Sequence, residues 1–221
     1  MSTKDFRKKQ GRIPVACEGV PFIVAGMFAT LVTAILGWAA ITLALLAVTL
    51  LVGHFFRDPE RVTVAGENDI VSPADGSIIE VRKVRSSRFT DRPAMKISIF
   101  MSVFDVHVNR APISGTIQGV FYKKGLFKAA NFAEASEKNE QNWLWIRSDS
   151  GLDVVITQVA GLIARRIVCW PVIGDRVIQG ERFGLIRFGS RMDVYAPEDC
   201  EVLVSRGQHV FAGETVLCRL K

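Results

Sequence analysis

The sequence has few of the residues from which metal centres and disulfide frameworks are built. It contains three histidines and four cysteines in 221 residues, and no two cysteines have the Cys-x-x-Cys spacing. Metal-dependent hydrolases need clustered His and carboxylate ligands, and His54 lies in a long apolar stretch. We therefore expect no metal site. Cys169 and Cys218 lie in apolar strand patterns, which favours reduced thiols and a cytoplasmic setting.

Long basic runs are also missing. Lys and Arg outnumber Asp and Glu by 28 to 22, but outside an N-terminal cluster the basic residues are spread along the chain. A net charge of +6 favours anionic partners such as phospholipid headgroups. Nucleic-acid-binding proteins usually concentrate basic and aromatic side chains in one region, so we expect no nucleic-acid partner.

Charge is absent from residues 20–56, which contain no Asp, Glu, Lys or Arg. One straight helix of that length would measure about 55 Å, whereas the hydrocarbon core of a bilayer is about 30 Å thick. We predict instead two short apolar helices, 21–36 and 39–56, joined at Gly37-Trp38. Basic residues flank both outer ends, and the positive-inside rule then places both ends on the cytoplasmic side of the inner membrane. A signal peptide would have a much shorter apolar core.

The pattern changes after residue 61 to short alternating segments separated by Gly, Pro, Asp and Asn. We therefore divide the chain into an anchor with its linker, residues 1–61, and a β-rich domain, residues 62–221. The one predicted helix of that domain lies within 128–138, where Ala, Glu and Lys dominate. The predicted strands are 78–84, 95–101, 116–122, 143–147, 152–159, 164–170, 182–188, 192–195, 201–204 and 215–220.

An internal repeat refines this fold class. Gly-Asp-Arg-Val-Ile-Gln-Gly-Glu at 174–181 recurs as Gly-Gln-His-Val-Phe-Ala-Gly-Glu at 207–214, and Pro-x-x-(Gly/Cys)-x-(Ile/Val) begins at residues 73, 112 and 197. Repeated turn-strand units predict interlocked hairpins in a mainly β (α+β) fold. The pattern is similar to the flattened β-sandwich of biotinyl and lipoyl carrier domains. A carrier has a lysine at an exposed hairpin tip, where this chain has Gly189-Ser190. A non-enzymatic, membrane-tethered carrier or interaction domain is the alternative to an enzyme.

Three polar residues could carry chemistry, although each also has an ordinary structural interpretation. Ser190 follows Gly189 between two alternating segments and could be a turn residue, as could Asp75 before Gly76. His107 could be a hydrogen-bonded structural histidine. Their combination with an apolar N-terminus makes Ser190 the candidate reacting centre.

Five motifs make the pattern specific. They occur in the order and spacing of the phosphatidylserine decarboxylase family, and the chain most resembles its short bacterial and archaeal form. The resemblance covers nearly the whole chain, including the apolar N-terminus. The motifs are Ser-Pro-Ala-Asp-Gly at 72–76, Met-Ser-Val-Phe-Asp-Val-His-Val-Asn-Arg at 101–110, Tyr-Lys-Lys-Gly-Leu-Phe at 122–127, Asn-Glu-Gln-Asn at 139–142 and Arg-Phe-Gly-Ser at 187–190.

The resemblance implies a proenzyme that cuts itself between Gly189 and Ser190 and converts Ser190 into a pyruvoyl group. The products of the cut would be a β chain, residues 1–189, and an α chain, residues 190–221. Ser190 Oγ would attack the Gly189 carbonyl, with His107 as base and Asp75 holding the imidazole in one tautomer.

The resemblance also implies the reaction of the mature enzyme. The pyruvoyl group would form a Schiff base with phosphatidylserine in the membrane and accept the electron pair left by CO2, giving phosphatidylethanolamine without pyridoxal phosphate or a metal. His107 is the expected proton donor. A homodimer is compatible with the sequence. A related decarboxylase acting on another phosphoserine lipid is a further alternative.

One residue departs from the long-form members of the family, which carry a second His three positions after the residue that matches His107. This chain has Arg110 there, and a guanidinium that stays protonated cannot be a base. Either His107 serves both steps, or Asp75 acts through water in the first. Basic side chains near the reacting centre are predicted to contact lipid phosphate or the substrate carboxylate, and the candidates are Lys123, Lys124, Arg187 and Arg191.

Overall fold

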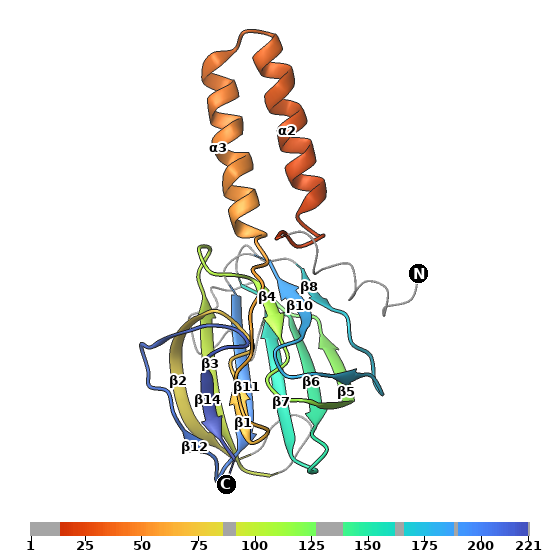
Figure 1. The fold of residues 1–221 in the computed structure, drawn as a ribbon, viewed down its shortest axis with the longest axis vertical. Helices are drawn as coiled ribbons and strands as arrows, with labels where there is room; N and C mark the ends of the chain where they lie inside the picture. Colours follow the sequence, from red (N-terminus) through yellow and green to blue (C-terminus); the bar gives the residue numbers. More distant parts are fainter. Residues whose placement is uncertain (1–13, 86–91, 127–138, 162–165, 188–189, 221) are drawn as a thin grey trace. The chain divides into compact units, whose positions relative to one another are not determined.

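The computed structural model describes residues 14–85, 92–126, 139–161, 166–187 and 190–220 (Figure 1). The chain divides into two units, Met1–Glu60 and Arg61–Lys221. The helix predicted within 128–138 and Gly189 lie outside the described residues.

The first unit contains two apolar helices, α2 (Val20–Ile35) and α3 (Ala39–Phe55), which form a hairpin (Figure 1). Both agree with the predicted ranges to within one residue at each end. The turn uses Gly37 at φ +74°, a conformation that glycine adopts without a steric penalty. Within the part of the chain that the structure describes, no helix is long and apolar enough to cross a membrane.

The two helices contact each other through small and hydroxyl-bearing residues. Thr42 Oγ1 donates to Thr33 Oγ1 at 3.0 Å, and a Cβ at Gly26 would lie 2.4 Å from Thr49 Oγ1. The large apolar side chains point away from this contact, and Phe28 and Ile35 are 67% and 76% exposed. The hairpin therefore presents its apolar surface outward.

The second unit is mainly β, which confirms the predicted fold class. Eight strands form one antiparallel sheet in the order β13-β2-β3-β11-β7-β6-β5-β9, and two three-stranded sheets have the orders β1-β14-β12 and β4-β10-β8. The strands are β1 (Asp69–Val71), β2 (Gly76–Val84), β3 (Ala94–Met101), β4 (Val108–Arg110), β5 (Gly115–Lys123), β6 (Gln141–Arg147), β7 (Asp153–Val159), β8 (Ile167–Cys169), β9 (Arg176–Val177), β10 (Arg182–Ile186), β11 (Ser190–Pro197), β12 (Glu201–Val202), β13 (His209–Val210) and β14 (Val216–Arg219).

The strands on either side of the predicted cut do not form a hairpin. β10 pairs with β4 and β8, whereas β11 pairs with β3 and β7. The prediction of an exposed hairpin tip at Gly189-Ser190 was therefore wrong for Ser190, which begins β11 and is fully buried. The chain crosses from one sheet to another at this point.

The repeated Gly-x-x-Val-x-x-Gly-Glu segments have the same conformation. Gly174 and Gly180 have φ of +88° and +78°, and Gly207 and Gly213 have +89° and +76°. Each segment contains one two-residue strand, and these strands, β9 and β13, pair with the first two residues of β5 and β2.

The strands that receive these segments match as well. The register of β2 shifts between Ile78 and Glu80, and that of β5 shifts between Ile117 and Gly119. Ile78 exchanges backbone hydrogen bonds of 2.8 and 2.9 Å with the segment 207–208, and Ile117 exchanges two of 2.8 Å with the segment 174–175. The repeat seen in the sequence is therefore a structural repeat, and β13-β2-β3 corresponds to β9-β5-β6.

Alternation along β11 separates two environments. Met192 and Val194 belong to the main hydrophobic core, and Ser190 points to the same face as they do. Tyr195 packs instead with Ala94 and Val155 in a separate cluster on the opposite face. Both faces of β11 are thus buried.

Candidate active site

Ser190 lies at the start of a central strand and is fully buried. It is paired in register with Met101, the last residue of β3. Its Oγ donates to the Met101 Sδ at 3.4 Å, and a thioether is only a weak acceptor. The hydroxyl is thus held in a water-excluded position by a weak interaction, which leaves it available to react with a neighbouring carbonyl.

His107 lies in the connection between β3 and β4 and is 2% exposed. Its Nδ1 is 2.9 Å from the backbone oxygen of Asp105. A carbonyl can only accept, so this contact favours the tautomer with the proton on Nδ1 and the lone pair on Nε2. We predicted that Asp75 would set the tautomer, but the acceptor at Nδ1 is the Asp105 carbonyl.

The backbone of His107 also touches the strand that precedes the predicted cut. The Ile186 N–H donates to the His107 oxygen at 3.4 Å, and Ile186 ends β10, four residues before Ser190. The backbone at His107 is therefore bonded to the strand that ends four residues before Ser190.

Asp75 is buried in an ion pair with Arg61. The two guanidinium nitrogens Nη1 and Nη2 donate to Oδ1 and Oδ2 at 2.5 and 2.7 Å, and the Ala212 N–H donates to Oδ1 at 2.8 Å. Bidentate pairs of this kind fix the orientation of a carboxylate. Arg61 is the last residue of the predicted linker, and the sequence did not identify it as a partner of Asp75.

The internal repeat shows what is particular to Asp75. Its counterpart in the other half is Ser114, whose Oγ accepts from the Gln179 N–H at 3.0 Å as Asp75 accepts from the Ala212 N–H. A neutral hydroxyl is therefore sufficient to hold this turn. The carboxylate at 75 has an additional role in binding Arg61.

Strand register brings these residues to one end of the sheet. Ser77 of β2 and Arg191 of β11 both lie opposite Phe100 of β3, so Gly76 and Ser190 flank Met101 on its two sides. Neighbouring strands are about 4.8 Å apart. A Cβ at Gly76 would lie 2.1 Å from the Phe100 oxygen, so only glycine fits here. The start of β2 after Asp75, the end of β3 and Ser190 therefore lie at the same end of three adjacent strands.

A chain of buried amides reaches the same methionine. Asn142 Nδ2 donates to Gln158 Oε1 at 3.0 Å, and Gln158 Nε2 donates to Asn109 Oδ1 at 2.9 Å. The Asn109 Nδ2 lies 4.0 Å from Met101 Sδ. These residues fix the side chain against which Ser190 rests. Asn109 and Asn142 lie in two of the sequence motifs, which was the signal available for them.

Arg191 does not have the position that we predicted for it. It is 2% exposed on the face of β11 opposite to Ser190, where Nε donates to Asp193 Oδ1 at 2.6 Å and Nη2 to Ser98 Oγ at 2.8 Å. Its Nη2 also lies 3.2 Å from Glu80, and Lys96 Nζ lies 3.2 Å from Asp193. The guanidinium is engaged inside the protein, so it is not part of a basic surface.

This internal network keeps Asp193 charged. Burial opposes ionisation of the carboxyl, but the positive charges of Arg191 and Lys96, together with hydrogen bonds, hold the pKa of Asp193 below its ordinary value. The network anchors the first residues of β11 from the side away from Ser190.

The other basic candidates are more accessible. Lys124 is exposed, and Lys123 and Arg187 are half-buried. Arg187 directly follows β10, and its backbone N–H donates to the Arg166 oxygen at 3.3 Å. Among the described residues, no group of three or more His, Cys, Asp or Glu is arranged to hold a metal ion.

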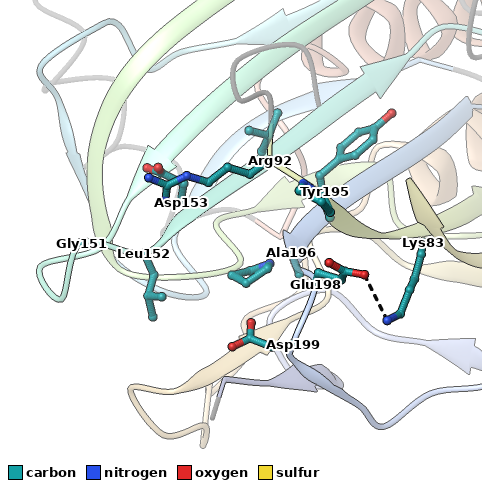
Figure 2. A pocket seen from close by; sticks show the side chains of 13 residues that line it. Lys83, Arg92, Gly151, Leu152, Asp153, Tyr195, Ala196, Glu198 and Asp199 are labelled. Atoms are coloured by element: carbon teal, nitrogen blue, oxygen red, sulfur yellow. Dashed lines mark hydrogen bonds and ion pairs between the residues drawn. The ribbon is translucent and has the colours of Figure 1, made fainter. Parts of the chain in front are cut away.

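A cavity of about 650 Å³ opens at the other end of β11 (Figure 2). Its lining mixes both signs of charge, and Lys83 Nζ lies 3.1 Å from Glu198 Oε1. Tyr195 and Ala196 line it, and six residues of extended strand span roughly 20 Å. This cavity is therefore separate from Ser190.

Comparison with known proteins gives a consistent result. The sequence pattern of the family described as phosphatidylserine decarboxylase matches residues 48–218. The chain is 50% identical over 204 residues to a protein of Geotalea uraniireducens and 48% identical over 208 residues to one of Syntrophotalea carbinolica. These matches cover 92% and 94% of this chain and 95% and 97% of the relatives, and both relatives are named phosphatidylserine decarboxylase proenzyme. A Geobacter sulfurreducens protein of the same name is 49% identical.

Proposed function

Because this chain belongs to the phosphatidylserine decarboxylase family, we propose that it cuts itself between Gly189 and Ser190 and decarboxylates with a pyruvoyl group made from Ser190. The enzyme converts phosphatidylserine into phosphatidylethanolamine and CO2 and is made as a proenzyme. The observation that supports the proposal is the position of Ser190, which is fully buried and weakly bound to Met101 at the end of β3.

In the proposed cut, His107 Nε2 takes the hydroxyl proton while Ser190 Oγ attacks the Gly189 carbonyl, and the peptide bond rearranges to an ester. Removal of the Ser190 Hα then breaks the Cβ–O bond. Gly189 leaves as a carboxylate, and residue 190 becomes dehydroalanine. Addition of water releases ammonia and leaves the pyruvoyl end.

We assign the base of the first step to His107. Support comes from the tautomer that the Asp105 carbonyl favours and from the occupied oxygens of Asp75, which accept from Arg61 and from the Ala212 N–H. Asp75 would then be a fixed, ion-paired carboxylate that orders the segment before β2. One imidazole would serve both cutting and protonation of the product.

The residues around Ser190 fit a pyruvoyl group. A pyruvoyl group supplies a ketone that binds the substrate amine and accepts the electron pair released with CO2. The Met101 side chain provides an apolar surface beside residue 190. On the opposite face of the sheet, the Arg191 side chain is held by Asp193 and Ser98, which fixes the backbone next to residue 190. His107 would return a proton to the substrate carbon, and Lys123, Lys124 and Arg187 would contact the lipid phosphate or the substrate carboxylate.

The two products of the cut would remain one protein. All the strands of the α chain, residues 190–221, pair with strands of the β chain, residues 1–189, or with each other. β11 lies between β3 and β7, β13 pairs with β2, and β14 pairs with β1. We further propose that the apolar hairpin enters the cytoplasmic membrane, with the β domain on the cytoplasmic side.

Intact mass of the purified protein tests this function. Wild-type protein should separate into two chains in denaturant, whereas Ser190→Ala should stay a single 24.4 kDa chain without decarboxylase activity. Ser190→Cys keeps a nucleophile and should cut slowly. Wild-type protein that is uncut and still active would overturn the pyruvoyl proposal, because an internal serine offers no ketone. An uncut and inactive wild type would favour the carrier alternative.

A further inference from the structure

The connection between β3 and β4 contains a closed turn, residues 102–105. The Ser102 N–H donates to Asp105 Oδ2 at 2.7 Å, the Asp105 N–H donates to the Ser102 oxygen at 3.1 Å, and the Phe104 N–H donates to Ser102 Oγ at 3.3 Å. Three hydrogen bonds fix a short segment. Its position is also fixed, because it follows Met101 and precedes His107.

The tip of this turn is apolar and exposed. Phe104 is 67% exposed and Val103 is 40% exposed. A side contact joins the turn to β13, where His209 Nε2 lies 3.5 Å from Asp105 Oδ1. The His209 ring lies edge-on to Phe211 with centroids 5.1 Å apart, and Phe211 is 46% exposed.

The exposed apolar surface continues along the segment after Arg61. The Arg61 guanidinium lies 5.9 Å from the Phe211 ring centroid, and Thr63 packs against Gly180 and Gly213. The residues on either side of Thr63, Val62 and Val64, are 79% and 89% exposed. Ile178, the counterpart of Phe211 in the repeat, is 64% exposed. We call these residues the apolar rim: Val62, Val64, Val103, Phe104, Ile178 and Phe211.

We propose that the apolar rim is a second membrane contact, made by the β domain itself, with Phe104 inserted into the bilayer that holds the substrate. This rests on the proposed function. Single exposed apolar residues are ordinary on protein surfaces, but a connected group marks an interaction surface. The rim carries the turn that joins Met101 to His107, so it adjoins the segment that supports the candidate site. A two-chain lipid reaches a fully buried serine most directly from a bilayer lying against this rim.

Tryptophan fluorescence locates the contact. In full-length protein with Trp38→Phe, Phe104→Trp is compared with Leu203→Trp on vesicles of phosphatidylserine and phosphatidylcholine with brominated acyl chains. Leu203 is a matched site, 43% exposed and just after β12, which follows the end of β11 away from Ser190. Figure 1 shows β12 and the β3–β4 connection at opposite ends of the β domain.

The two sites should behave differently. The indole introduced by Phe104→Trp should lose at least half of its added emission to bromine quenching, and the indole introduced by Leu203→Trp should lose little. Absent quenching in the Phe104→Trp protein, or equal quenching in both proteins, would overturn the inference. Phe211→Trp repeats the measurement if Phe104→Trp does not fold.

Activity gives a second measurement. Phe104→Ser should lower the ratio of kcat/KM on vesicles to kcat/KM on monomeric short-chain phosphatidylserine about tenfold, and Leu203→Ser should leave the ratio unchanged. An unchanged ratio in Phe104→Ser would contradict the membrane contact. If the proposed pyruvoyl function were wrong, the wild type would instead be inactive on both substrates, so the two failures are distinguishable.

Discussion

Asp193 is a charged residue whose burial has a measurable consequence. Its carboxylate is 1% exposed and contacts Arg191 and Lys96, both nearly buried. Removing one partner of a buried ion pair leaves an uncompensated charge, so Asp193→Asn should cost about 3–5 kcal/mol in the free energy of unfolding at pH 7. Urea unfolding measures this, in the uncut Ser190→Ala background so that a single chain unfolds.

The same variant should change the dependence of stability on pH. The pKa of Asp193 is lower in the folded protein than its ordinary value of about 3.9. Its stabilisation is therefore present above that value and is lost as the pH falls through the lower folded pKa. Asp193→Asn should accordingly flatten the acid limb of the stability curve. Asp149→Asn, which removes an exposed pair with Arg176, is the control and should change stability little; an equal loss in both variants would contradict this account.

His107 and Asp75 can be separated by two further variants. Asp75→Asn keeps an acceptor for the Ala212 N–H but loses the ion pair with Arg61, so cutting should slow without stopping. His107→Ala should abolish cutting, because no other group is assigned to take the Ser190 proton. Intact mass followed over time measures both rates. Normal cutting in His107→Ala would mean that His107 is not the base of the first step and would favour Asp75 acting through water.

At the scale of elements, two glycines from the repeated segments can be compared. Gly180 and Gly207 both have positive φ, which costs a residue with a Cβ about 1–2 kcal/mol. A Cβ at Gly207 would meet no atom within 4 Å, whereas at Gly180 it would clash with Thr63 Oγ1. Gly207→Ala should therefore destabilise by about 1–2 kcal/mol and Gly180→Ala by more. Urea unfolding gives both values, and equal losses would show that Thr63 moves aside freely.

The elements also show what could be predicted from the sequence. The long strands β2, β3, β5, β6 and β7 are rich in β-branched and other apolar residues and were predicted, as were both apolar helices. β1, β4, β9 and β13 have two or three residues each, too few for a periodic pattern, and were missed. The prediction for β11 began two residues late and gave Arg191 a contact with lipid or substrate. A charged residue two positions before Asp193 resembles a surface pattern when its partners on β2 and β3 are unknown.

The candidate site was predicted in part for a similar reason. Ser190 and Asp75 could be singled out because motifs mark them. Neither the Asp105 carbonyl at His107 nor Arg61 at Asp75 could be predicted, since a backbone oxygen carries no sequence signal and the guanidinium comes from outside the motifs. The hairpin predicted around Ser190 was wrong because alternation does not reveal that the chain changes sheets there.

At the scale of the whole molecule, the two units should separate in function. Deleting residues 1–56 removes the apolar hairpin and leaves Arg61, so the β domain should fold and cut itself while much of it leaves the membrane fraction. Flotation with vesicles measures the bound fraction, and a high-salt wash removes electrostatic binding. Undiminished, salt-resistant binding of the truncated protein would mean that the hairpin is not the principal anchor.

The central position of β11 has a consequence for the life of the mature enzyme. Before the cut, unfolding and refolding involve a single chain and do not depend on protein concentration. After the proposed cut, the strand between β3 and β7 would belong to a peptide with no covalent link to its neighbours, so the melting temperature should rise with concentration, as it does for a heterodimer. On dilution, an unfolded mature molecule would lose its 32-residue fragment and with it the reacting group. The uncut chain could therefore refold after unfolding, whereas the cut protein, once diluted, could not recover its active form.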